Sequence, residues 1–248
     1  DHRVLGHFLD QGPSPPIAQF GRAASSEKSL GGSKLNPFKN DRGLCVLGDF
    51  QCCRMFLVRF EICASTQSLT SPLTLDTNSA HPLLSVSDDL RSAMRVKQRL
   101  PCATHPDRFD HWAQVLTVQT FSSGTHYWEV EAEGFWDIAV SYRSIGRKGK
   151  EGTAFGNNKM SWSLTQQHDR KLAAWHNRRK TRLSSRMSGN RVGVALDYGV
   201  GTITFSEVGP SNTLTHLHTF STSFNQPVCL GFGLYKAELH SRISIVRV

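Results

Sequence analysis

Histidine is one residue type through which this chain could bind a metal ion, and the chain has eleven of them. Three lie near two aspartates in one region: His105, Asp107, Asp110, His111 and His126. His216 and His218 alternate along an expected strand, but no third ligand accompanies them. Because a metal site needs ligands that converge in space and not only in sequence, we predict no metal and no cofactor.

The six cysteines could also bind zinc or form disulfides: Cys45, Cys52, Cys53, Cys63, Cys102 and Cys229. Zinc sites commonly space their ligands as C-x-x-C or C-x-x-H. Here Cys52 and Cys53 are adjacent, and no histidine lies between Cys45 and Cys63. A disulfide framework is possible on count alone, but the spacing is irregular. We therefore favour reduced thiols and a cytoplasmic location.

Motifs of nucleophilic or phosphate chemistry are absent from the sequence. It contains neither the G-x-S-x-G turn of serine hydrolases nor the G-x-x-x-x-G-K-[S/T] phosphate loop. The stretch 146–152 is basic and rich in glycine, but it lacks the phosphate-loop spacing and the helix that should follow. We predict that this chain is not an enzyme.

The chemistry that remains is that of binding, and its strongest signal is Trp175 followed by Arg178, Arg179 and Lys180. Tryptophan and arginine are enriched at binding hot spots, because they offer a large contact area and charge-assisted hydrogen bonds. Residues 143–191 carry thirteen Lys or Arg against two acidic residues, a net charge of +11 in a chain of +9. Such a block is typical of a surface for an acidic partner, of RNA binding, or of ordinary solvated loops.

RNA binding is the serious alternative to protein binding. Trp136, Trp162 and Trp175 lie in or beside the basic block, and aromatic rings between cations suit base stacking with phosphate contact. Against this, the sequence has no RNA-recognition motif, KH signature or zinc finger. We rank a protein partner first and RNA second.

The length and composition indicate one globular domain with an extension. Of the 248 residues, 38% are hydrophobic and 9% aromatic, and no apolar run reaches the roughly 18 residues of a membrane span. Residues 1–72 are rich in Gly, Ser and Pro and hold no apolar period, which predicts a flexible extension. The chain begins at Asp1, so we expect a piece of a longer protein.

From about residue 73 the chain becomes a series of short apolar runs separated by turn residues, which is typical of a β-sandwich. We predict strands at Trp112–Val118, His126–Ala132, Trp136–Tyr142, Lys159–Leu164, Leu172–His176, Arg191–Asp197, Thr202–Phe205, Leu217–Phe220, Val228–Gly233 and Ile243–Val248. One short helix or turn is expected between Ser87 and Arg99. The predicted fold is all-β: a two-sheet antiparallel sandwich with a poorly ordered N-terminal extension.

Three sequence motifs stand within this region. The first is Leu73-Thr74-Leu75-Asp76 with Ala80-His81-Pro82, the second is His126-Tyr127-Trp128-Glu129-Val130-Glu131, and the third is Leu196-Asp197-Tyr198 with Gly201. In this order and spacing they resemble the PRY–SPRY domain of tripartite-motif (TRIM) ubiquitin ligases, over about 70% of the chain. The resemblance implies a PRY segment at 73–125 and a SPRY segment at 126–248, together one compact domain of the concanavalin-like type.

The motif residues identify the fold more than a binding site. Alternation places Trp128 and Val130 on the buried face of one strand, and Gly201 suits a turn with positive φ. The residues that carry the resemblance are Leu75, Asp76, His81, Pro82, Trp128, Glu129, Val130, Leu196, Asp197 and Tyr198.

The resemblance also implies that variable loops bind the ligand. These loops are roughly Val96–His111, Ala132–Asp137, Tyr142–Asn158, Thr165–Leu183 and Gly233–Ser241. Trp136, Asp137 and Tyr235 occupy positions where members of the family often contact ligands, and Trp175, Arg178, Arg179 and Lys180 complete the candidate set.

The function that follows is recognition of a protein target, as the substrate- or pathogen-recognition part of a TRIM-type ligase or of an innate immune regulator. The alternative is an RNA-binding module that uses residues 143–191. Ligase activity would need an upstream RING, and a stand-alone decoy or regulator without ligase function is a further possibility. We expect the isolated domain to be monomeric and not bound to membranes.

Overall fold

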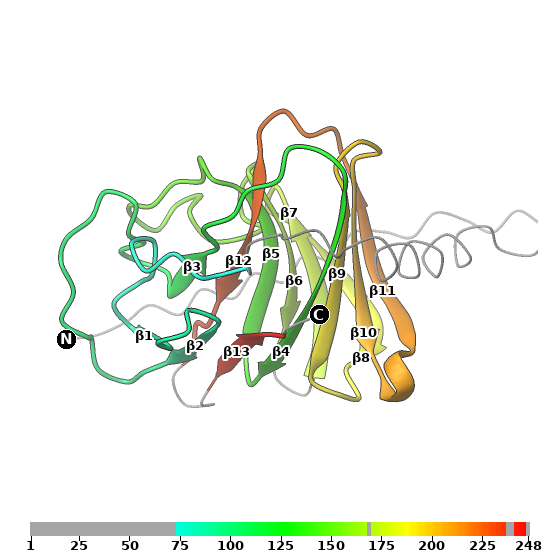
Figure 1. Cartoon of the computed structure of the whole chain (residues 1–248), viewed down its shortest axis with the longest axis horizontal. Coiled ribbons are helices and arrows are strands. Elements are labelled where there is room, and N and C mark those ends of the chain that lie inside the picture. Colours follow the sequence, from blue (N-terminus) through cyan, green and yellow to red (C-terminus); the bar gives the residue numbers. More distant parts are fainter. Residues whose placement is uncertain (1–72, 168–169, 237–240, 247–248) are drawn as a thin grey trace, which may run out of the picture. The chain divides into compact units, whose positions relative to one another are not determined.

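The computed structural model describes residues 73–167, 170–236 and 241–246, which form two antiparallel β-sheets packed face to face (Figure 1). This arrangement confirms the predicted all-β sandwich. The predicted extension at 1–72 lies outside the described residues.

One sheet has seven strands in the order β1-β2-β13-β4-β9-β10-β11. Their bounds are β1 Leu84–Val86, β2 Ser92–Arg95, β13 Arg242–Ile245, β4 Thr125–Glu133, β9 Arg191–Asp197, β10 Thr202–Val208 and β11 Leu214–Ser221. The other sheet has six strands in the order β3-β12-β5-β6-β7-β8. Their bounds are β3 Gln114–Leu116, β12 Val228–Gly233, β5 Trp136–Tyr142, β6 Ser161–Gln166, β7 Lys171–His176 and β8 Arg179–Arg186.

Alternating side chains build the core between the sheets. In β5, Trp136, Ile138 and Val140 are at most 1% exposed and belong to the main core cluster. Val194 of β9 and Phe205 of β10 reach the same cluster from the other sheet. Full burial of each such side chain contributes about 2–3 kcal/mol, so the two inner faces account for most of the driving force.

The connection between β9 and β10 depends on a glycine, as the sequence predicts. Gly201 has φ +79°, and a Cβ there would lie 1.7 Å from the carbonyl oxygen of Thr222. The Asp197 carboxylate accepts the Val200 N–H at 2.8 Å and closes the turn. The third motif therefore serves a turn and a strand.

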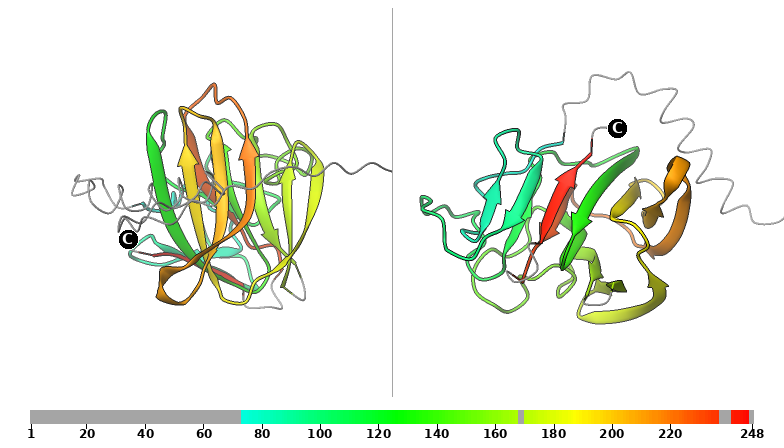
Figure 2. Two further views of the ribbon diagram at one scale, coloured as in Figure 1. Left: turned by 90° about the vertical axis from the view of Figure 1, so that its right-hand side faces the viewer. Right: turned by 90° about the horizontal axis from the view of Figure 1, so that it is seen from below.

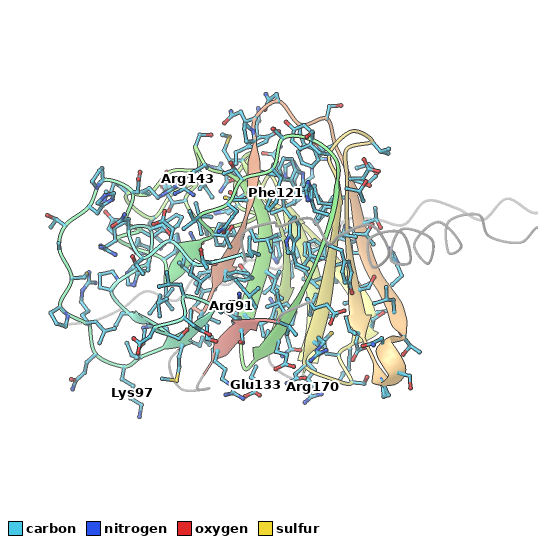
Figure 3. The ribbon with its side chains drawn as sticks, viewed as in Figure 1. Arg91, Lys97, Phe121, Glu133, Arg143 and Arg170 are labelled. Carbon is cyan, nitrogen blue, oxygen red and sulfur yellow. The ribbon has the colours of Figure 1, made fainter. Side chains whose placement is uncertain are left out.

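The first motif joins the PRY segment to the rest of the sandwich. Asp76 is 7% exposed and pairs with Arg143, which follows β5 and also donates to the carbonyl of Thr117 (Figure 3). His81 is 2% exposed; its Nδ1 accepts the Leu83 N–H, so its Nε2 donates to the Asp110 carbonyl. Burial lowers the pKa of His81 to about 4, which keeps this ring neutral.

The predicted strands at Trp136–Tyr142, Arg191–Asp197 and Val228–Gly233 match β5, β9 and β12 residue for residue. Where a helix or turn was expected, at 87–99, the structure has a turn followed by strand β2. A 3-10 turn at Pro210–Asn212 precedes β11. β1, β2 and β8 were not predicted, and β8 occupies part of the region expected to be a loop.

Candidate ligand-binding surface

The outer face of the six-stranded sheet, turned away from the other sheet, carries two rows of side chains that cross all six strands. Strand register defines the first, here called the Asp137 row: Gln114, Gly233, Asp137, Thr165, Ala173 and Arg182. The second, the Trp175 row, is Leu116, Gly231, Ala139, Ser163, Trp175 and Lys180. At roughly 4.8 Å between strands, each row spans about 24 Å.

Asp137 is the charged residue at the middle of its row. It is 4% exposed, and its Oδ1 has no hydrogen-bond partner within the described part of the chain. Burial raises the pKa of Asp137 to about 7, although side-chain hydrogen bonds with Thr165 and Tyr235 lower it in part. The carboxyl group therefore titrates near neutral pH, far above the usual range of an aspartate.

Tyr235 and Trp112 form an aromatic end to the Asp137 row. The Tyr235 hydroxyl donates to Oε1 of Gln114 at 2.9 Å, and its ring crosses Gly233 so closely that a Cβ there would lie 2.5 Å from the hydroxyl oxygen. Trp112 packs edge-on against Tyr235 with ring centroids 5.6 Å apart. Both aromatic side chains are half-buried. Residues from the PRY and SPRY segments thus meet at one place.

The loop that follows β5 covers much of the Trp175 row. Phe155 of this loop packs with Leu116, Ala139 and Cys229 in a second buried cluster. The loop is also bound to the β7–β8 turn, since the Arg178 N–H donates to the Gly156 carbonyl at 3.1 Å. The region predicted as the variable loop Tyr142–Asn158 is consequently packed onto the Trp175 row of the outer face.

Cations form the opposite end of both rows. Lys180 places its ammonium 5.1 Å from the centroid of the Trp175 ring, and Trp175 itself is half-buried. Arg178, Arg179, Lys180 and Arg182 are all exposed. The surface therefore has a cationic end and an aromatic end.

The structure places the seven predicted site residues differently from one another. Asp137 lies in the Asp137 row and Tyr235 at its end, while Trp175 and Lys180 are cross-strand neighbours in the next row. Arg178 and Arg179 lie at the turn that joins β7 to β8. Trp136 is 1% exposed and faces the other sheet. It is a core residue, so we leave it out of the candidate surface.

Trp112 and Arg182 belong to this surface but were not predicted. Gln114 and Thr165 of the Asp137 row, which were not predicted either, are buried and support it from below. Arg182 could have been found, because Lys180 and Arg182 alternate and so share one face of a strand. Trp112 and Gln114 reach this position because β3 pairs with β12, a strand far away in the sequence. A single sequence does not indicate which distant strands pair.

The basic block of residues 143–191 is not one patch. Arg143 pairs with Asp76, Arg170 donates to the carbonyls of Met187 and Ser188, and Arg191 pairs with Glu129 and Glu131. Figure 3 shows Arg143 and Arg170 near opposite ends of the sandwich. The net charge of +11 therefore divides among structural arginines, exposed lysines of the loop after β5 and the exposed cations of the β7–β8 hairpin.

The histidines considered as metal ligands do not converge. His111 packs against Trp112, whereas His126 stacks on Trp128 at the other sheet. Within the described ranges, no group of three or more His, Cys, Asp or Glu side chains could hold a metal ion. In the same part of the chain, no helix is both long and apolar enough to cross a membrane.

Comparison with known protein families agrees with the fold and the motifs. Residues 73–121 match the SPRY-associated domain, PRY, and residues 125–244 match the SPRY domain. Together these two matches cover nearly all of the residues that the structure describes.

Similar proteins include a fish toxin and a tripartite-motif protein. The chain is 36% identical over 168 residues to stonustoxin subunit beta of Synanceia horrida, which covers 67% of this chain and 24% of the toxin subunit. It is 34% identical over 172 residues to tripartite motif-containing protein 14 of Mus musculus, covering 67% of this chain and 38% of that protein. The matched part is thus well under half of either relative.

Solved structures share the fold. The TRIM65 PSpry domain aligns with a TM-score of 0.66 at 28% identity, over 82% of this chain and 100% of that domain. The stonustoxin structure aligns with the same TM-score at 34% identity, over 71% of this chain and 28% of the toxin chain.

Proposed function

Because this chain belongs to the PRY–SPRY family of protein-interaction modules found in tripartite-motif proteins, we propose that it recognises a target protein through the outer face of its six-stranded sheet. The observation that carries the proposal is the meeting of Trp112 and Tyr235, one from each family segment, at the end of a row that leads to exposed Arg182. A SPRY domain is a binding module and not a catalytic one.

We further propose that the domain is the target-recognition part of a TRIM-type ubiquitin ligase or of an innate immune regulator, and that it acts in the cytoplasm. The similarity to tripartite motif-containing protein 14 and to the TRIM65 domain supports this context. Ubiquitin transfer would then come from other parts of a longer protein, and this chain alone would not ubiquitinate a target.

The first test is capture of a target from lysates of infected and resting cells by the full 248-residue chain, with and without nuclease. The captured protein is identified, purified and titrated against wild type, Trp112→Ala and Val200→Ala. Val200 is 59% exposed in the β9–β10 turn of the other sheet and serves as the matched control. Loss of a half-buried aromatic anchor costs about 2 kcal/mol, so Trp112→Ala should weaken binding about thirtyfold.

Three outcomes decide the proposal. Weakened binding by Trp112→Ala with unchanged binding by Val200→Ala supports it. Equal binding by both variants, with unchanged melting temperatures, contradicts the assignment of this surface. Capture that collapses with nuclease contradicts a protein target and favours RNA.

A further inference from the structure

Strand β8 is the outer edge of the six-stranded sheet and has β7 as its one paired neighbour within the described chain. Figure 2, left, shows the β7–β8 hairpin at the margin of the sandwich. Arg179, Lys180, Thr181 and Arg182 are exposed on both faces of the strand. The first half of β8 therefore extends beyond the packed core, where another chain can approach it.

The geometry of the hairpin determines which main-chain groups point outward. Asn177 and Arg178 have φ +49° and +66°, the conformation of a two-residue type I′ turn. Such a turn is closed by a pair that exchanges main-chain hydrogen bonds, here His176 with Arg179. Bonding then alternates along the strand. Thr181 bonds to β7, and Lys180 and Arg182 direct their N–H and C=O groups away from the sheet.

The residues with outward main-chain groups are also the cationic ones. The side chains of Lys180 and Arg182 share the outer face of the sheet, while Arg178 and Arg179 add charge at the turn. None of these four forms an ion pair with a carboxylate of the described chain; the ammonium of Lys180 lies over Trp175. Five consecutive positions, 178–182, thus carry a net charge of +4.

An exposed edge strand is a template for strand addition, and its charges select what can be added. A second copy of β8 would place cations opposite cations and is disfavoured. A nucleic acid would meet the charges but has no ladder of amide and carbonyl groups. Trp175 is also half-buried and covered by Lys180, so its ring is not free to stack on a base.

We propose that β8 pairs with an extended acidic segment of the target protein, which adds an antiparallel seventh strand to the six-stranded sheet. Main-chain hydrogen bonds to Lys180 and Arg182 hold the added strand in place. Carboxylates directly opposite these two residues make the edge selective for acidic segments. The inference rests on the proposed function, because it takes the partner to be a protein, and it adds the chemistry and conformation of the bound segment.

The test uses a fluorescent peptide of about eight residues, the length of β8, in which Glu and Thr alternate. Binding to the full chain is measured by anisotropy. In the proposed pairing, Glu residues lie opposite Lys180 and Arg182, so their own N–H groups bond to β8. N-methylation of the Glu residues should weaken binding at least about tenfold, whereas N-methylation of the Thr residues, whose N–H groups point away, should leave it nearly unchanged.

Variants and competitors complete the experiment. The double variant Lys180→Glu, Arg182→Glu should bind the Glu–Thr peptide at least about tenfold more weakly than wild type. The control variant Lys150→Glu, Lys159→Glu, which changes two exposed cations outside β8, should bind the peptide as tightly as wild type. A Lys–Thr peptide should not bind. Equal affinity of the two methylated peptides, or stronger binding of a single-stranded RNA of equal charge through Lys180 and Arg182, overturns strand addition.

The two proposals can fail separately. If the acidic peptide does not bind but target capture is still lost in Trp112→Ala, strand addition fails and the proposed function stands. If capture does not respond to Trp112→Ala while the peptide binds as described, the edge is a binding site and the assignment of the Asp137 row fails.

Discussion

At the scale of single residues, the burial of Asp137 should have the most direct measurable effect, which is on the pH dependence of stability. Its pKa of about 7, raised mainly by burial, means that the folded domain holds a proton which the unfolded chain releases near pH 4. The folded state thus binds more protons than the unfolded state between these values. Stability from this group is complete below about pH 4 and is lost as the pH rises towards 7.

We therefore expect Asp137→Asn to flatten the pH dependence of unfolding. Between pH 4 and pH 7 the wild-type chain should lose free energy of unfolding relative to the variant, with a steepest slope of about 1.4 kcal/mol per pH unit and a total on the order of 4 kcal/mol. Denaturant titrations at pH 4.5, 6 and 8 measure the difference. Parallel curves for the two proteins would show that the pKa of Asp137 is not raised in the folded state.

Single residues also show where sequence reasoning stops. In β5, Trp136 alternates with Ile138 and Val140, and that pattern alone assigns the ring to the core, whatever the frequency of tryptophan at hot spots. Arg182 shares a face with Lys180 by the same rule. The meeting of Trp112 with Tyr235, by contrast, depends on the pairing of β3 with β12, which no local pattern contains.

At the scale of elements, buried strands were predictable and exposed ones were not. β5 and β12 are fully buried and β9 is buried at alternate positions, so their apolar or β-branched residues set clear bounds. β8 has the sequence RKTRLSSR, which has no buried face and therefore no apolar alternation. β2, with SAMR, is missed because it is short and buries only one small side chain, Ala93. An edge strand that is held mainly by main-chain hydrogen bonds shows little hydrophobic pattern in its sequence.

Substitutions in two turns of the sandwich should change the free energy of unfolding in opposite directions. Arg178 has φ +66°, which strains any residue but glycine, so Arg178→Gly should raise the free energy of unfolding by about 0.5–1 kcal/mol. Gly201→Ala, at φ +79° and in contact with the Thr222 carbonyl, should lower it by more than about 2 kcal/mol. Chemical denaturation measures both. A loss of stability in Arg178→Gly would mean that the arginine side chain supports the hairpin.

At the scale of the whole molecule, the two family segments are interleaved and do not form separate bodies. β1 and β2 of the PRY segment extend the seven-stranded sheet through β13, and β3 lies beside β12 in the other sheet. Buried Asp76 reaches Arg143 across the junction. Neither segment can expose its strands without breaking pairs in the other, so the described domain should unfold as one unit.

We expect tryptophan fluorescence and far-UV circular dichroism to give coincident denaturation curves for the full chain. Arg143→Met should shift both curves together by about 2 kcal/mol, because it leaves the Asp76 carboxylate buried without its partner and frees the carbonyl of Thr117. Arg242→Met is the control, since its ion pair with Glu133 is exposed on both sides and its loss should leave both curves nearly unchanged. If Arg143→Met separates the two curves, the PRY strands unfold before the SPRY strands. The two segments would then be separate cooperative units that the Asp76–Arg143 pair holds together, in spite of their shared sheets.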